Sequence, residues 1–169
     1  MNQKWSKVKK ILEDDYLCES LKGRVAYFNT RYNSAHDHAG RICILVDKKE
    51  ILSMPSLKEY ELYELAHEMK TSDQSLKEAY ENADEILCYK GIFAPRDFGE
   101  AFEIYQNQKI AESIHSANLL VKLFAILDRR TGKRTLETLK EECTKLPEWL
   151  QYFYHLRMGN NKVATEETQ

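Results

Sequence analysis

The first 46 residues combine a helical pattern with two strand-like runs. In segment 4–16, apolar residues recur at helical spacing with lysines on the opposite side, which predicts an amphipathic N-terminal helix. Segments 24–32 and 41–46 are rich in β-forming residues, and the polar segment 33–40 separates them. Two such runs joined by a loop of this length favour an antiparallel hairpin, for which we expect apolar cover on both faces.

The remainder of the chain is predicted to be helical. Residues 50–52 either add a third strand or begin a helical turn, and after Pro55 the apolar spacing is helical. Ser56 is a candidate N-cap, and Gly91 is suited to end a helix because glycine enters the left-handed region without steric cost. Segment 119–127 is apolar nearly all round, which predicts a central buried helix.

These patterns together predict an α+β fold that is mostly helical. An N-terminal helix and an antiparallel β-hairpin, of two or three strands, would pack with five or six further helices. We expect one globular domain over residues 1–158, because neither an internal repeat nor a linker is evident. The polar segment 159–169 is predicted to be a disordered tail.

Charge and cysteine content disfavour several classes of protein. The 169 residues include 25 basic and 27 acidic ones, so the net charge of −2 argues against a dedicated nucleic-acid or membrane-surface protein. Segment 56–88 holds nine acidic and three basic residues, a local charge of −6. Four cysteines without a CxxC pair, and no apolar run long enough to span a bilayer, predict reduced thiols and a cytoplasmic protein.

The tightest group of potential metal ligands is His36-Asp37-His38, in the predicted hairpin loop. Two imidazoles at this spacing are weak candidates for a metal site, because loop geometry fixes little and no third ligand is evident. They are more simply read as exposed turn residues. A metal-dependent enzyme that uses His36 and His38 therefore stays an alternative, while no complete catalytic motif and no cofactor site is found.

Arg129, Arg130, Lys133 and Arg134 form the one dense basic cluster. They could bind an anion, such as a phosphate, a nucleic acid or an acidic protein. Alternatively, Arg129 and Arg130 could offset the negative end of a helix dipole, or the cluster could pair with segment 56–88.

The run from Trp149 to Tyr154 contains four aromatic rings in six residues. A helix cannot bury all of them on one side, because consecutive positions are about 100° apart. Some of Trp149, Tyr152 and Tyr154 should therefore reach the surface, where aromatic residues anchor protein interfaces. The structural alternative is that the tyrosine rings lie over a small core with their hydroxyls in water.

Four strings of this sequence resemble those of a family of uncharacterised small bacterial proteins. They are WSK (5–7), SLKGRV (20–25), LDRRTGKR (127–134) and WLQYFY (149–154). The resemblance covers almost the whole chain and implies a bacterial cytosolic protein, but it carries no activity. Small proteins of this type include immunity proteins that bind and neutralise a toxin, although such an analogy does not establish function.

The leading hypothesis is a non-catalytic protein-binding or regulatory module. Its contact surface would comprise Arg129, Arg130, Lys133, Arg134, Trp149, Tyr152 and Tyr154. We expect its partner to be another protein, with no membrane association, and the sequence leaves the oligomeric state open. The alternatives are the metal-dependent enzyme and a nucleic-acid binder that uses residues 129–134.

Overall fold

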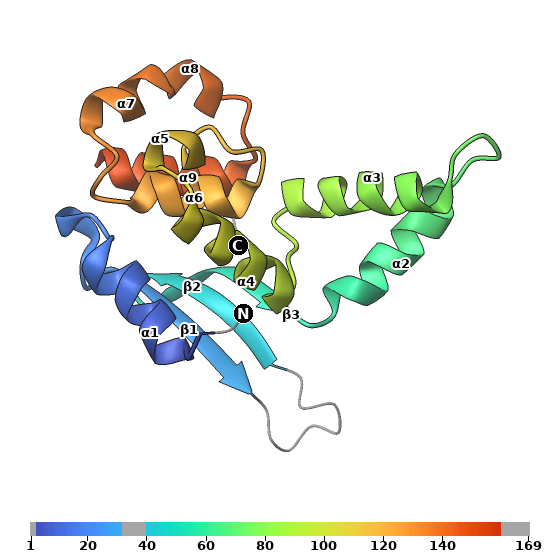
Figure 1. Ribbon diagram of the computed structural model, residues 1–169, viewed down its shortest axis with the longest axis horizontal. Coiled ribbons are helices and arrows are strands. Elements are labelled where there is room, and N and C mark those ends of the chain that lie inside the picture. The colour runs from blue at the N-terminus through green and yellow to red at the C-terminus, as the bar shows by residue number, and fades with distance from the viewer. Residues whose placement is uncertain (1–2, 32–39, 160–169) are drawn as a thin grey trace, which may run out of the picture.

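A three-stranded antiparallel sheet forms the base of the molecule. The computed structural model describes residues 3–31 and 40–159 (Figure 1). The strands β1 (Val25–Arg31), β2 (Gly40–Val46) and β3 (Lys49–Pro55) pair in the order β1-β2-β3. The predicted hairpin is therefore confirmed, and the third strand replaces the alternative of a helical turn. Asp47 and Lys48, both at positive φ, form the tight turn between β2 and β3.

One face of this sheet belongs to the main core. Tyr27 pairs with Ile44, which pairs in turn with Leu52, and all three side chains are buried. Period-two alternation places their neighbours on the other face, which is less well covered. There Phe28 is 43% exposed and Lys9 lies over its ring. The prediction that apolar cover extends over both faces is therefore wrong at this position.

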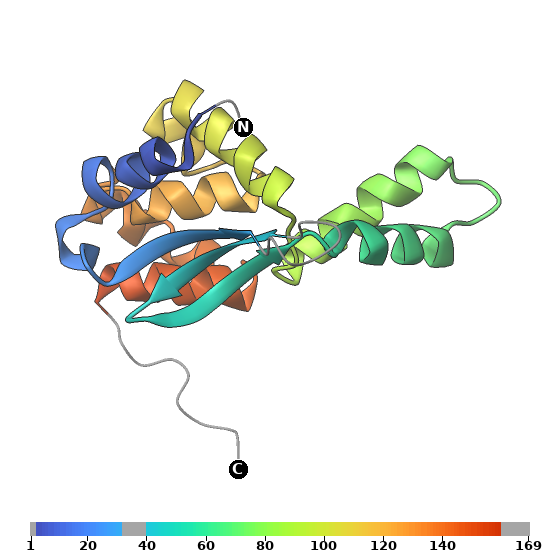
Figure 2. The same ribbon diagram turned by 90° about the horizontal axis from the view of Figure 1, so that it is seen from below.

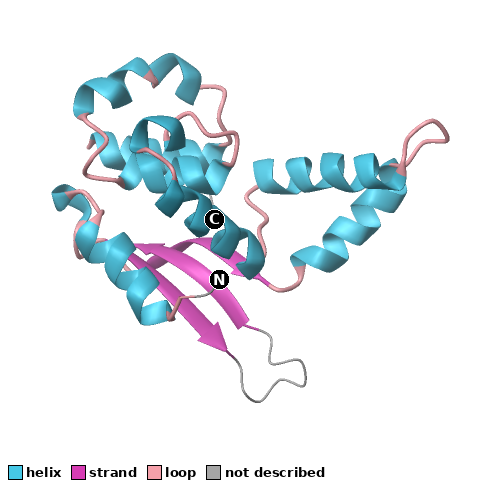
Figure 3. Ribbon diagram, viewed as in Figure 1, coloured by secondary structure: helices cyan, strands magenta, loops and turns pink. Residues whose placement is uncertain are grey.

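Helices make up most of the remaining chain (Figure 3). The N-terminal helix α1 (Trp5–Lys10) widens into a π-helical turn, η1 (Ile11–Asp15), and a short 3₁₀ turn, η2 (Glu19–Leu21), precedes the sheet. The helices that follow the sheet are α2 (Lys58–Met69), α3 (Leu76–Tyr89), α4 (Pro95–Asn107), α5 (Ile110–Ser113), α6 (Leu119–Leu127), α7 (Lys133–Thr138), α8 (Lys140–Cys143) and α9 (Glu148–Met158). The α+β, mostly helical architecture is confirmed.

The predicted central helix is α6, and it is buried from Leu120 to Leu127. Asn118 caps it by accepting hydrogen bonds from the backbone N–H groups of Leu120 and Val121. Phe124 packs among aromatic rings of α4, including Phe98 at 5.3 Å between ring centroids. Even Lys122 is buried, and its ammonium pairs with Glu142 of α8 at 2.6 Å. This helix therefore organises the main core.

Helices α2 and α3 form an antiparallel pair that extends away from the rest of the molecule, and both views show this projection (Figures 1 and 2). We call residues 57–89 the arm. The arm has its own small cluster of buried side chains, Ala66, Ala79 and Ala83, separate from the main core. Leu62, Leu65, Met69 and Tyr80 are partly buried and pack against these alanines. The core of the arm is therefore small and only partly shielded from solvent.

Some local predictions differ from the structure. Ser56 does not cap α2; its hydroxyl donates to the Gly40 carbonyl, and Leu57 takes the N-cap position without a side-chain cap. Ser75 caps α3 and forms a capping box with Glu78. Gly91 ends the α3 segment at φ +82°, as predicted. A Cβ there would also lie 3.0 Å from Cδ1 of Trp149, so both the backbone conformation and the close approach of this ring favour glycine.

Candidate functional site

The basic cluster predicted from the sequence contains a buried acid at its start. Asp128 follows α6 and is 1% exposed. Its carboxylate accepts hydrogen bonds from the backbone N–H of Arg130 at 2.7 Å and from Nη2 of the same residue at 2.6 Å. Nε of Arg130 donates to both carboxylate oxygens. The guanidinium of Arg130 is therefore held by its near neighbour, while 39% of the side chain stays exposed to solvent.

Two tyrosines complete this arrangement, which we call the clamp (Tyr16, Tyr105, Asp128 and Arg130). The guanidinium lies 3.9 Å from the ring centroid of Tyr16, and the Tyr105 hydroxyl donates to Asp128. The hydrogen bond to Asp128 raises the pKa of Arg130, while burial and the Asp128 charge raise the pKa of Tyr105. Both groups therefore keep their protons near neutral pH.

The clamp joins three parts of the chain. Residues 16–18 pair with the chain at the end of α6. The Cys18 N–H donates to the Leu127 carbonyl, and the Arg129 N–H donates to the Tyr16 carbonyl. Tyr105 belongs to α4. The string LDRRTGKR, one of the four that carry the resemblance, thus begins with a structural element that fixes the N-terminal segment against α4 and α6.

The C-terminal aromatic run is largely internal. Tyr154 is 3% exposed and its hydroxyl donates to the Leu136 carbonyl, so it is a core residue and not a surface contact as expected. Trp149 is partly buried; its ring stands edge-on to Phe93 and its Nε1 donates to the Tyr89 carbonyl. Tyr152 is partly buried too. Trp149 and Tyr152 therefore offer only part of their rings to solvent.

The other predicted residues have different environments. Arg129, Lys133 and Arg134 are exposed, and none of them forms an ion pair with another described residue. His36 and His38 lie outside the described residues. Within residues 3–31 and 40–159, no group of three or more histidine, cysteine, aspartate or glutamate side chains is arranged to hold a metal ion. The structure thus divides the basic cluster into one bound arginine and three accessible cations.

Exposed apolar groups are concentrated elsewhere, on the arm. Seven large hydrophobic side chains are exposed in the described part of the chain, and five of them lie in the arm: Leu57, Tyr60, Tyr63, Leu76 and Tyr89. Leu57, Tyr60 and Tyr63 are 68%, 65% and 54% exposed. Their spacing of three residues places them within about 120° of each other around α2. Sequence reasoning missed this patch because the same spacing is typical of a buried helix face.

The arm is also acidic. It contains nine acidic and three basic residues, a local charge of −6. Glu61 and Glu68 of α2 are exposed and have no cationic partner in the described part of the chain. Glu64 forms a hydrogen bond with the Tyr60 hydroxyl and raises the pKa of that group. The exposed tyrosines of α2 thus lie among carboxylates that are largely uncompensated.

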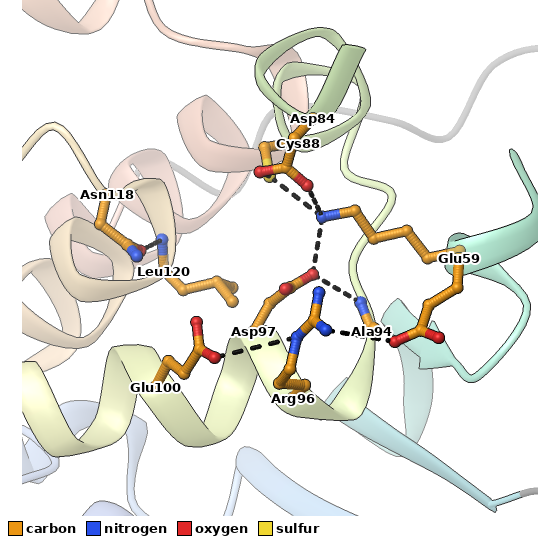
Figure 4. A network of polar contacts seen from close by, with 10 residues as sticks. Glu59, Asp84, Cys88, Ala94, Arg96, Asp97, Glu100, Asn118 and Leu120 are labelled. Carbon is orange, nitrogen blue, oxygen red and sulfur yellow. Dashed lines mark hydrogen bonds and ion pairs between the residues drawn. The ribbon is translucent and has the colours of Figure 1, made fainter. Parts of the chain in front are cut away.

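A buried lysine attaches the arm to the body (Figure 4). Lys58, the first residue of α2, is 2% exposed. Its ammonium lies 2.5 Å from a carboxylate oxygen of Asp84 in α3 and 2.7 Å from one of Asp97 in α4. It also donates to the Cys88 thiol at 3.5 Å. One side chain therefore connects both helices of the arm with the core helix α4.

The charges at this junction favour a fixed geometry. Burial opposes the ammonium form of Lys58, but the hydrogen bonds to Asp84 and Asp97 outweigh it and raise its pKa. Burial raises the pKa of the Cys88 thiol to about 11. Asp97 also accepts from the backbone N–H of Ala94 at the start of α4. The junction is thus a lysine ammonium between two carboxylates, beside a thiol that stays protonated near neutral pH.

A pocket of about 310 Å³ opens beside this junction. It is lined by residues of α3, α4 and the start of α6, among them Asp84, Cys88, Phe93, Asp97 and Glu100. Its carboxylates are mostly engaged, because Asp84 and Asp97 bind Lys58 and Glu100 lies near Arg96 (Figure 4). We therefore interpret the pocket as part of the joint between arm and body.

The comparisons with known proteins agree with the resemblance seen in the sequence. The model of the SF0329 protein family matches residues 4–158, so the chain belongs to that family. No activity is established for the family. Neither a curated protein nor a solved structure matches the chain. No helix in residues 3–31 and 40–159 has the length and apolar character needed to cross a membrane.

Proposed function

We propose that this protein is a non-catalytic module that binds another protein, and that the arm is its contact surface. The observation that carries the proposal is the placement of five of the seven exposed large hydrophobic side chains, among the described residues, on one projecting element. Tyrosine is enriched at the centres of protein interfaces, because its ring buries area while its hydroxyl still finds a polar partner.

Charge indicates what kind of partner would fit. An arm with a local charge of −6 attracts a basic surface and repels an acidic one. The expected partner therefore presents an apolar groove or patch with lysines and arginines at its edge. A basic toxin domain that is neutralised by this arm would be one concrete form of this function.

The surface proposed here differs from the one expected from the sequence. Arg130 and Tyr154 are committed to internal contacts, which removes the centre of the predicted basic and aromatic surface. The nucleic-acid alternative depends on the three cations that stay accessible, Arg129, Lys133 and Arg134. The metal-dependent enzyme remains an alternative that depends on His36 and His38.

We also infer a cytoplasmic location. All four cysteines lie in the described part of the chain and all are free thiols. Free thiols are typical of a reducing compartment.

Site-specific photo-crosslinking in cells of the source organism tests the proposal. A photo-reactive phenylalanine analogue replaces Tyr60 or Tyr63 in the arm, and in the matched control it replaces Ile104, which is exposed on α4. We expect both arm positions to give the same protein adduct and Ile104 to give none. Combining either position with Glu61→Lys and Glu64→Lys should abolish the adduct, because the basic partner would be repelled.

Two outcomes contradict the proposal. One is the absence of an adduct from both arm positions when the protein is folded and expressed at its natural level. The other is an identical adduct from the arm and from Ile104, which would indicate contact without a defined interface.

A further inference from the structure

A second pocket of about 310 Å³ lies at the other end of the molecule and is lined by cations. Three separate segments form it: the loop before β1, the start of α7 and the end of α9. Its polar lining comprises Ser20, Arg24, Lys133 and Arg157, and its apolar lining includes Leu21 and Leu156. No carboxylate occurs among its described lining residues.

The three cations of this pocket have only some of the hydrogen-bond acceptors and ion-pair partners that they could bind. Arg24 uses Nε and Nη2 to bind Asp47, at 2.9 and 2.7 Å, which leaves its Nη1 without a described partner. Lys133 is exposed and forms no ion pair with another described residue. Even with Asp47 counted, the group keeps an excess of positive charge.

Arg157 provides the strongest indication that an acceptor is missing. Its Nη2 donates to the Thr131 carbonyl at 3.1 Å, but its Nε is buried and has no hydrogen-bond partner in the described part of the chain. A buried charged donor without an acceptor is unfavourable. The dipole of α9 favours one cation in the last helical turn, but it accounts for neither Arg24 nor Lys133.

We infer that this pocket binds the phosphate group of a phosphate monoester. Such a group carries nearly two negative charges and strong acceptor oxygens, which suit guanidinium and ammonium donors and the Ser20 hydroxyl. The pocket exceeds the size of a phosphate alone, and its apolar side, with Leu21 and Leu156, can hold a compact organic group. A long polyanion fits less well, because the arm is strongly acidic.

This inference is independent of the proposed function, because none of the residues involved belongs to the arm. It also gives a role to two strings that carry the family resemblance. Ser20 and Arg24 come from SLKGRV, while Lys133 comes from LDRRTGKR, more than a hundred residues later in the sequence.

Calorimetric titration of the full chain with phenyl phosphate tests the inference. Lys133→Gln is the informative variant, since this side chain has no described ion pair whose loss would disturb the fold. Arg134→Gln is the matched control, because Arg134 is adjacent, exposed and absent from the pocket lining. We expect Lys133→Gln to weaken phenyl phosphate binding about tenfold and Arg134→Gln to change it less than about twofold.

Further titrations identify the source of the phosphate group. Inorganic phosphate and a phosphoserine peptide are compared with phenyl phosphate under the same conditions. Tighter binding of either ester than of inorganic phosphate supports the inference, and the tighter ester shows whether a small molecule or a modified protein is the source. The inference is overturned by no saturable binding of any probe up to about 10 mM. It is equally overturned if Lys133→Gln and Arg134→Gln weaken binding to the same extent.

Discussion

The clamp and the arm use charged and aromatic side chains in opposite ways. In the clamp, one arginine satisfies a buried carboxylate, and tyrosine rings of two segments enclose both groups. In the arm, tyrosines and glutamates are turned to solvent around a core of three alanines. The comparison shows that one member of a basic cluster can be held by the protein itself when a buried acid lies within reach of its guanidinium, as Asp128 does for Arg130.

The two regions also differ in how much apolar area they bury. The body buries large aromatic rings, including Phe98 and Phe102, which both pack against Phe124. The arm cluster fully buries only alanines, against which larger side chains pack partly buried, and the arm attaches to the body through the Lys58 junction. Because each ring buries much more apolar area than an alanine, we expect the arm to open before the body does.

The largest expected effect comes from breaking the clamp. Asp128→Ala should lower the free energy of unfolding by about 3 kcal/mol, because it leaves Arg130 and the Tyr105 hydroxyl without their acceptor. The value is at the low end for a buried ion pair, since Arg130 is partly exposed to solvent. Urea denaturation measures it, with Asp73→Ala in the exposed arm loop as the control. Equal stability of the two variants would show that the clamp contributes nothing to folding.

A smaller and local effect is expected in the arm core. Ala83→Leu should overpack the space between α2 and α3 and cost about 1–3 kcal/mol. Hydrogen exchange should then accelerate in residues 58–89 while the main core keeps its protection. Asn82→Leu, on the exposed side of α3, is the control and should leave exchange nearly unchanged. Uniform acceleration over the whole chain would show that the arm and body unfold as one unit.

Alkaline pH should weaken the Lys58 junction. The Cys88 pKa of about 11 lies above the ordinary 9.0. The protonated thiol therefore makes its full contribution to the free energy of unfolding below pH 9, and this contribution is lost as the pH rises towards 11. Lys58, whose pKa is also raised, loses its contribution above pH 10.5. The free energy of unfolding should therefore fall between pH 9 and 11. In Cys88→Ala, the free energy of unfolding should fall less steeply between pH 9 and 10. An unchanged slope would show that the Cys88 thiol does not cause this part of the fall.

The smallest effect is expected on the exposed face of α2. Tyr60→Ser and Tyr63→Ser should change the free energy of unfolding by less than about 0.5 kcal/mol, because both side chains are mostly in solvent. The same substitutions should abolish binding of the partner found by crosslinking. A loss of stability comparable to that of Asp128→Ala would instead assign these tyrosines to the fold.

The local hydrophobic pattern predicted the structure correctly where the residues of one segment determine its conformation. The alternation in 24–32 and 41–46 places Val25, Tyr27 and Ile44 in the core, and the apolar run 119–127 becomes the central helix. Between residues 133 and 143 the helical structure is divided between two short helices, α7 and α8. The cap at Ser56 failed because a tertiary partner, the Gly40 carbonyl, competes for the same hydroxyl.

The sequence by itself determined the α+β class, the strand faces and the buried central helix, because hydrophobic periodicity acts over neighbouring residues. Only the tertiary structure decided which charged and aromatic residues face outward. Arg130 is bound to Asp128 and lies over the ring of Tyr16, although part of it stays exposed. Tyr154 is buried, and the Leu136 carbonyl accepts its hydroxyl. Tyr60 and Tyr63 stay in solvent because they lie on the arm, which extends away from the described elements of the body. Burial depends on contacts between distant segments, and a one-dimensional pattern does not contain them.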